Sequence, residues 1–300
     1  MEFAVNYTAL LAELVRAGQV RVDRFKCPAW PGLLAEARQT LPVYIHFPLG
    51  IGRGEGCAFD SETRRPADLA RLEDLLALSG TPYVNTHFIA PHDSYPGIAV
   101  ESTRPDHIRR VLDGALRDLE PLIARFGAGR VLVENIINER GWLTLSVLPE
   151  VIGRLLEETG CNFLFDLSHA RLAAANLGVD PRAYAAAMPV ERIREVHVTG
   201  LQVLEGPLLE LMREIGDPYG FAESMAGKPI DHLPMTGEDW PELAWMLGEI
   251  AAGRWASPWV AAFEYGGVGH FWEEVTDRQV YLEQLPRMEA MIHGAGRLQG

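Results

Sequence analysis

Short runs of β-branched and aromatic residues alternate along the chain with longer segments in which apolar residues recur at helical spacing. That alternation is typical of repeated βα units around a parallel sheet. It predicts eight strands, at Glu2–Tyr7, Asp23–Pro28, Pro42–Leu49, Tyr83–Phe88, Arg130–Ile136, Asn162–His169, Arg194–Gly200 and Trp259–Gly266. It also predicts eight helices, at Thr8–Ala17, Trp30–Arg38, Pro66–Leu78, Pro105–Phe126, Leu145–Thr159, Asp180–Ala187, Glu238–Ala252 and Trp272–His293. We therefore expect an α/β fold, a closed (β/α)8 TIM barrel, because closure leaves no edge strand exposed.

Length and spacing favour one barrel domain over residues 1–300, since no Pro- or Ser-rich linker divides the chain. Three connections are longer than a barrel requires: residues 50–65, 89–104 and 202–237. Each follows a strand on the side where barrel active sites are built. We expect these loops to form the walls or lid of a pocket at the C-terminal face.

The formal net charge of −14 and the pI near 5.1 disfavour nucleic acid and anionic membranes as partners. Three cysteines, Cys27, Cys57 and Cys161, form neither a disulfide framework nor a CxxC zinc motif. No apolar run approaches 18 residues, and no basic segment precedes an apolar stretch at the N-terminus. These features predict a soluble protein of the cytoplasm.

Residue types that bind metal ions recur where apolar strand segments end and in the last long loop. They are His46, His87, Glu134, Asp166, His169, His197, Asp231, His232 and Glu264. Ionisable groups buried after apolar runs are costly unless a partner neutralises them, and a divalent ion is such a partner. Carboxylate and imidazole ligands without thiolate suit zinc, manganese or ferrous iron. We expect one to three ions.

Two ligand pairs carry a geometric expectation. Asp166 and His169 form a DLSH tetrad where a strand gives way to a turn, and residues three apart can then converge on one side. Asp231 and His232 are adjacent, and adjacent strand residues point to opposite faces. Only one of this second pair is expected to bind unless the backbone bends.

These motifs resemble the xylose isomerase-like TIM-barrel superfamily, which includes sugar isomerases and epimerases, the endonuclease IV group and multinuclear non-heme iron-dependent oxidative enzymes. The VEN motif at Val133–Asn135 and the DxxH at Asp166–His169 are most similar to the oxidative enzymes. The resemblance to the epimerases implies that Glu134 and Glu264 form an acid/base pair at a single metal. One departure is the adjacent Asp231 and His232, where related proteins carry Asp-x-His.

Other interpretations remain open. The strand-end carboxylates could be paired with Arg or Lys inside the barrel, although Lys26 is almost the only basic residue at a strand end. Asn6, Lys26 and Asn135 are expected to line the substrate pocket, but Lys26 could equally be a salt-bridge partner. The glycine-rich run at residues 50–56 (GIGRGEG) lacks the GK[ST] of a phosphate loop, and flexibility accounts for its glycines.

Three hypotheses follow. The leading one is a multinuclear iron enzyme that oxidises a peptide or small metabolite. The second is a single-metal sugar or sugar-phosphate isomerase or epimerase. The third is a non-catalytic binding protein. The acidic charge disfavours a further option, a zinc phosphodiesterase of the endonuclease IV type. Apolar helix residues such as Trp245 and Met246 could cover a homodimer contact.

Overall fold

The computed structural model describes residues 1–138, 141–215 and 220–297, and a parallel barrel is its central feature. Neighbouring strands pair in parallel in the order β3-β2-β1-β13-β10-β9-β8-β7-β4. Their bounds are β1 (Glu2–Asn6), β2 (Arg24–Cys27), β3 (Val43–Ile45), β4 (Leu49–Ile51), β7 (Val84–Phe88), β8 (Val131–Glu134), β9 (Asn162–Asp166), β10 (Ile193–Val198) and β13 (Val260–Phe263). Seven of the eight predicted strands each match one of these strands. The prediction at Pro42–Leu49 corresponds to β3 and to the start of β4.

The third predicted strand is split between the two ends of the parallel order. β3 pairs with β2 and β4 pairs with β7, so the chain crosses from one end of the sheet to the other within residues 46–48. Asn85 on β7 spans this break: its side-chain oxygen accepts from the Phe47 amide at 2.7 Å, and its NH2 donates to the Phe47 carbonyl at 3.2 Å. A side chain thus replaces the missing ladder bonds, because buried backbone groups need partners.

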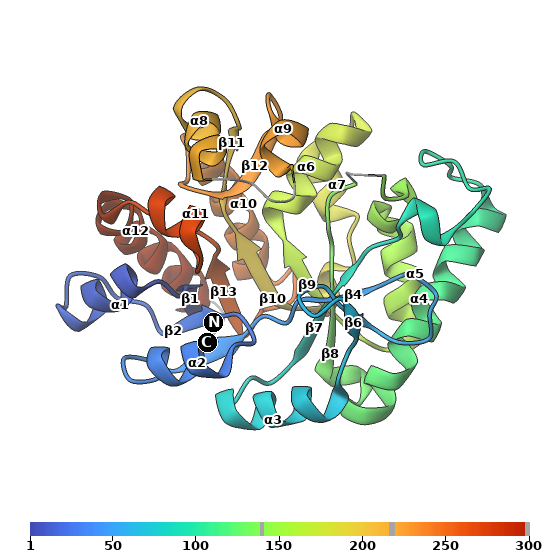
Figure 1. Ribbon diagram of the computed structural model, residues 1–300, viewed down its shortest axis with the longest axis horizontal. Coiled ribbons are helices and arrows are strands. Elements are labelled where there is room, and N and C mark those ends of the chain that lie inside the picture. Colours follow the sequence, from blue (N-terminus) through green and yellow to red (C-terminus); the bar gives the residue numbers. More distant parts are fainter. Residues whose placement is uncertain (139–140, 216–219, 298–300) are drawn as a thin grey trace.

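Helices surround the barrel (Figure 1). Those that match predicted helices are α1 (Ala9–Arg16), α2 (Pro31–Ala37), α3 (Leu69–Ser79), α4 (Pro105–Phe126), α5 (Pro149–Thr159), α7 (Pro181–Ala186) and α10 (Asp239–Ala251). The helix predicted from Leu145 begins later, at Pro149, after a short 3-10 turn at Thr144–Val147. Proline at the first position of α5 fits this start, since its missing N–H is not needed there.

Three predictions about helices need correction. The sequence predicts one helix over Trp272–His293, but α11 (His270–Val275) and α12 (Arg278–Arg297) are separate. The side chain of Asp277 accepts from the Gln279 amide at 2.8 Å and so caps α12. α6 (Leu167–Leu177), directly after β9, was not predicted. The loop at 202–237 holds further elements: α8 (Gly206–Ile215) and α9 (Phe221–Met225), enclosed by the antiparallel strands β11 (Gly200–Val203) and β12 (Pro229–Leu233), at the top of Figure 1.

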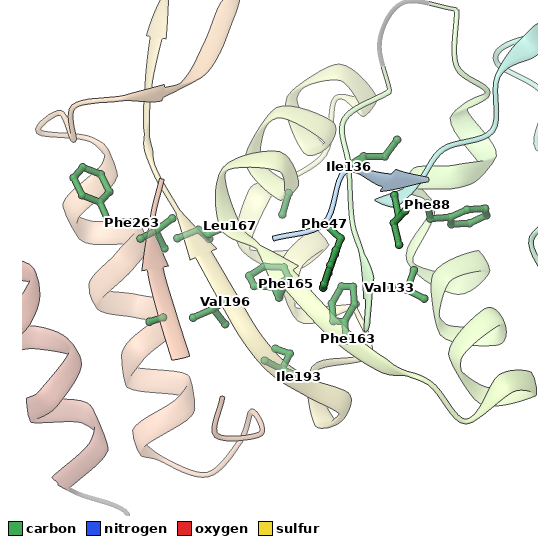
Figure 2. Close-up of a cluster of buried hydrophobic side chains, with 14 of the residues drawn as sticks. Phe47, Phe88, Val133, Ile136, Phe163, Phe165, Leu167, Ile193, Val196 and Phe263 are labelled. Carbon is green, nitrogen blue, oxygen red and sulfur yellow. The ribbon is translucent and has the colours of Figure 1, made fainter. Parts of the chain in front are cut away.

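Side chains alternate between the two faces of every barrel strand. The outward residues pack under the helices in the main apolar core, as Phe163, Phe165, Val196 and Phe263 do in Figure 2. The inward positions of these strands carry Glu134, Asp166 and His197, and Glu264 directly follows β13; all four are buried. A separate small cluster, Ala4, Tyr44, Val260 and Ala262, packs together, apart from the main core. Because strand side chains have a period of two, the apolar run and the polar ligand belong to opposite faces.

The remaining strands, β5 (Phe59–Asp60) and β6 (Arg65–Pro66), extend β4 as an antiparallel meander. Within the described ranges, no helix combines the length and apolar character that crossing a bilayer requires.

Replacing Asn85 with Ala tests the closure. The variant leaves the Phe47 N–H and C=O without partners, so we expect the unfolding free energy to fall by about 3 kcal/mol in urea titrations. Asn162→Ala is the matched control, because its amide donates to one carbonyl, that of Gly129, at an exposed position; its loss should stay within about 1 kcal/mol. Equal losses in the two variants would contradict the proposed role of Asn85.

Candidate metal centre

Strand register brings the candidate ligands together at the C-terminal end of the barrel. His87 lies beside Glu134 in the β7–β8 pair, and His197 lies beside Asp166 in the β10–β9 pair. In parallel strands that share a register, these inward positions form one layer. The sequence therefore brings residues far apart in the chain to one rim.

Glu134 is the centre of this layer. Its Oε2 lies 3.2 Å from His87 Nε2 and 3.6 Å from His46 Nε2. Its Oε1 lies 3.7 Å from His197 Nδ1. Two groups of three potential ligands contain it, one with His46 and His87 and one with Asp166 and His197, each with ligand atoms within 4.8 Å of one another. One carboxylate therefore serves two candidate ion positions.

Backbone carbonyls fix the orientation of two imidazoles. His87 Nδ1 donates to the Leu49 carbonyl at 2.9 Å, which leaves Nε2 facing Glu134. His169 Nδ1 donates to the Asn135 carbonyl at 2.9 Å, so its Nε2 is the nitrogen available to a ligand. Such outer hydrogen bonds set the tautomer of metal-binding histidines.

The DLSH tetrad folds as a helix start. Asp166 is the N-cap of α6, and its Oδ1 accepts from the His169 amide at 2.7 Å. The residue three positions on is thereby held on the same side as the carboxylate, as the spacing predicts. Asn135 was expected to line the substrate pocket, but it is not among the residues that line the cavity over this site. Its buried amide group is hydrogen-bonded to the backbone N–H and C=O of Asp166.

Asp231 and His232 both face the site, although they are adjacent on β12, outside the barrel. Asp231 Oδ2 lies 3.1 Å from His169 Nε2, and His232 Nε2 lies 4.0 Å from Glu264 Oε2. His232 has a φ of 61°, a left-handed conformation that bends the strand. This bend is what allows both adjacent side chains to face the site.

Glu264 is engaged by side chains. Lys26 Nζ contacts its Oε1, and His197 Nδ1 lies 3.2 Å from the same oxygen. This bears out the salt-bridge alternative for Lys26. Asn6 donates to the Gly266 carbonyl at 3.0 Å and lines the same cavity as Lys26.

Glu195 is a site residue that sequence reasoning missed. Its Oε1 lies 2.8 Å from His197 Nε2, and its side chain is buried. A third ligand group joins it with His46 and His197. Its position two residues before His197 on one strand face was the available signal.

The buried charges perturb one another strongly. Burial alone would raise the pKa of Glu134, but the surrounding imidazoles, His87 first, hold that pKa below its usual range. Burial raises the pKa of Asp166 to about 7. Burial opposes a charge on His197, yet neighbouring carboxylates, Glu264 first, raise its pKa to about 10. An imidazole that keeps its proton against burial indicates a negative potential, which favours a cation.

Unpaired buried atoms lead to the same conclusion. In the described part of the chain, these include His46 Nδ1, Glu134 Oε2, Asp166 Oδ2 and His197 Nδ1, none of which has a hydrogen-bond partner. Buried polar atoms without partners are costly and rare. Coordination to a divalent ion would satisfy the oxygens and the His197 nitrogen, so the donor set fits zinc, manganese or ferrous iron.

A cavity of about 400 Å³ opens over this layer. Its walls include Tyr7, Trp30, Ser61, His232 and Trp272. A second cavity of about 540 Å³ shares Pro48, Ser61 and His87 with it and extends to His92 and Trp142. Each of the three long loops thus contributes residues to the two cavities.

The glycine-rich loop is anchored from below. Asp118, fully buried on α4, accepts from the amides of Gly52 at 2.8 Å, Gly54 at 2.9 Å and Gly56 at 2.8 Å. Gly52 has a φ of 103°, and a Cβ there would lie 2.4 Å from the Ile89 carbonyl oxygen. The glycines therefore meet a geometric requirement beyond the expected flexibility, and the anion that this loop binds is the protein's own carboxylate.

Fold and site together define a TIM barrel with a carboxylate and histidine centre that could hold metal. A fusion protein described as "xylose isomerase-like TIM barrel/4-hydroxyphenylpyruvate dioxygenase" superimposes with a TM-score of 0.52 at 16% identity, over 98% of this chain and 44% of its own. At that identity the likeness shows the fold alone.

Sequence comparison gives the family. A UPF0276 protein of Shewanella amazonensis is 32% identical over 195 residues, covering 56% of this chain and 69% of that protein. Another, from Caulobacter vibrioides, is 29% identical over 233 residues, which cover 73% of this chain and 78% of that protein. The chain belongs to the UPF0276 family. The family model "RiPP precursor modification enzyme MbnB/TglH/ChrH" matches residues 116–211, a range that includes Glu134, Asp166, His169 and His197.

The shared role of Glu134 predicts unequal losses of metal. After anaerobic loading with ferrous iron, we expect His87→Ala to lose about one ion per chain and Glu134→Ala to lose both, because only Glu134 belongs to both groups. Elemental analysis measures this. His107→Ala, whose imidazole bonds Ser102 away from both cavities, is the control. Equal losses from the two site variants would contradict a bridging carboxylate.

Asp118→Asn tests the loop anchor. The amide group would present a donor to at least one backbone N–H, so the unfolding free energy should fall by about 3 kcal/mol. Asp113→Asn on the same helix, where the carboxylate pairs with Arg109 at a partly exposed position, should change it by less than about 1 kcal/mol. Urea titration measures both free energies. An unfolding free energy that Asp118→Asn leaves unchanged would show that the loop needs no anchor.

Proposed function

We propose that this protein is a metal-dependent enzyme that oxidatively modifies a ribosomally synthesised precursor peptide. The observation that carries the proposal is Glu134, a buried carboxylate whose two oxygens face separate ligand groups. The family model, which describes precursor-modifying enzymes, supports the substrate class. Two ion positions sharing one carboxylate suit redox chemistry that needs more than one metal.

The chain's own residues would divide the work. His46 and His87 would hold one ion with Glu134, and Asp166 and His197 the other. Iron bound in these positions would supply electrons to dioxygen and an open coordination position for the substrate. The aromatic rings of Trp30 and Trp272 line the cavity and would limit access of water to the reacting groups.

The two adjoining cavities suit a peptide. The smaller, above Glu134, has room for one reacting side chain, and the larger lies beside it across Pro48, Ser61 and His87. A residue next to the reacting one could extend into the larger cavity.

A sugar or sugar-phosphate isomerase is the second candidate, because Glu134 and Glu264 line the same cavity. An acid/base pair needs one carboxyl that is protonated at neutral pH. Burial alone would raise the pKa of both carboxyls. Nearby imidazoles, His87 first for Glu134 and His197 first for Glu264, instead hold each pKa below its usual range. We place the oxidative reaction first, because Glu134 belongs to two groups of close ligand atoms, whereas Glu264 is engaged by Lys26 and belongs to none among the described residues.

The test is a change in peptide mass that depends on iron and oxygen. Protein loaded with ferrous iron is mixed with peptides from short reading frames beside its gene, exposed to air and analysed by mass spectrometry. We expect a modified peptide with the unaltered protein and with His107→Ala, and none with Glu134→Ala or without oxygen. Unmodified peptides together with manganese-dependent interconversion of ketoses would contradict the proposal and favour the isomerase.

A further inference from the structure

Glu195 is a buried carboxylate one layer below the candidate metal centre. It precedes His197 by two residues on β10, so both side chains point into the barrel. In the register of the sheet it lies beside Val260, which belongs to the small apolar cluster apart from the main core. Only 4% of Glu195 is exposed. A charged group at this depth is costly without a partner, and His197 is that partner.

The two ring nitrogens of His197 face different carboxylates. Nε2 lies 2.8 Å from Glu195 Oε1. Nδ1 lies 3.2 Å from Glu264 Oε1 and 3.7 Å from Glu134 Oε1, and this buried atom has no hydrogen-bond partner within the described part of the chain. Among the described residues, Glu134 and Glu264 line the cavity over the site and Glu195 does not. One nitrogen is therefore occupied, and the other is free for a ligand on the cavity side.

The spacing on the two sides of the ring separates a hydrogen bond from a shared ion. Nitrogen and oxygen ligands that each lie about 2.1 Å from a tetrahedral ion are about 3.4 Å from each other. The distances of 3.2 and 3.7 Å on the Nδ1 side bracket this value, whereas 2.8 Å on the Nε2 side is the length of a direct N–H···O bond. Glu195 and His197 also form a close group with His46, but their short contact is poorly suited to two ligands of one ion.

We propose that Glu195 is a positioning residue: it accepts the Nε2 proton of His197 and thereby makes Nδ1 the nitrogen that binds the ion shared with Asp166. This inference rests on the metal centre proposed above, and it removes Glu195 from the candidate ligands. Outer hydrogen bonds of this kind fix the tautomer of a metal-binding histidine. His87 and His169 donate from Nδ1 to backbone carbonyls and so offer Nε2, which is the reverse arrangement.

The acceptor at His197 also carries a charge. A carboxylate makes a stronger hydrogen bond than a carbonyl does, and it increases the basicity of the ring nitrogen that binds the metal. His46, at the other ion position, lacks such support, because its buried Nδ1 has no hydrogen-bond partner among the residues that the structure describes. The effect of Glu195 should therefore be confined to the ion position of Asp166 and His197.

Zinc binding in two single-site backgrounds tests the proposal without any assay of activity. His87→Ala keeps the ion position of Asp166 and His197, and Asp166→Ala keeps the position of His46 and His87. Competition with a chelator measures the zinc affinity of each variant. Adding Glu195→Leu should weaken zinc binding about 10- to 100-fold in the first background and less than about threefold in the second.

Glu195→Gln and Glu2→Leu are the matched controls. Glutamine keeps an oxygen that accepts the Nε2 proton but loses the charge, so zinc affinity in the His87→Ala background should fall by less than about tenfold. Glu2 pairs with Arg24 at the opposite end of the barrel, and its replacement should leave the zinc affinity unchanged. A residue that only supports the fold would give similar losses in both backgrounds.

Nitrogen NMR on the unaltered protein remains decisive if Glu195→Leu does not fold. Protein labelled with ¹⁵N at histidine is loaded with zinc, which causes no paramagnetic broadening. We expect one imidazole to bind zinc through Nδ1 and to keep an Nε2 proton that exchanges slowly with water, since the buried Glu195 accepts it. Zinc bound through Nε2 in every coordinated imidazole would show that the Glu195 side of His197 faces the ion, and would refute the proposal.

The outcomes separate this inference from the proposed function. Unchanged zinc affinity after Glu195→Leu, or equal losses in the two backgrounds, would overturn the role of Glu195 and leave the Glu134 centre standing. No bound zinc in the unaltered protein would overturn both.

Discussion

The sharing of one buried carboxylate between two sets of ligands is the interaction on which the candidate site depends. Glu134 is 1% exposed, and imidazoles face both of its oxygens. A lone carboxylate in this position would be costly, and the histidines that compensate it are themselves disfavoured by burial. The arrangement is stable only as a group, with protons or metal ions supplying positive charge. That requirement explains why the pKa of His197 is raised to about 10. Burial disfavours the charged imidazole, but the neighbouring carboxylates, Glu264 first, favour it more strongly.

The barrel supplies the precision that this group needs. Parallel pairing places His87 beside Glu134 and His197 beside Asp166, and the same alternation sends Phe163 and Phe165 to the apolar layer under the helices. The split third strand adds a further element, since it exposes the Leu49 carbonyl to His87 and leaves His46 between β3 and β4. Distortion of one strand therefore positions two ligands of the same candidate ion.

The sequence predicted the eight strands because strand period and apolar runs are local signals, and it predicted that the candidate ligands meet because strands end at one rim. It did not predict α6, since Asp166 ends a strand and caps a helix at once. The side-chain pairing of Glu195 with His197 and the carboxylate of Asp118 beneath the glycine loop depend on tertiary contacts. The same holds for the bend at His232, where a left-handed histidine has no marker in the sequence.

Anomalous diffraction from crystals grown with iron, measured on both sides of the iron absorption edge, tests the central claim most directly. The account predicts two iron peaks on either side of the Glu134 carboxylate, one within reach of His46 and His87 and the other within reach of Asp166 and His197. A single peak that Glu134 does not contact, or ligand side chains bonded only to one another after iron is supplied, would contradict it.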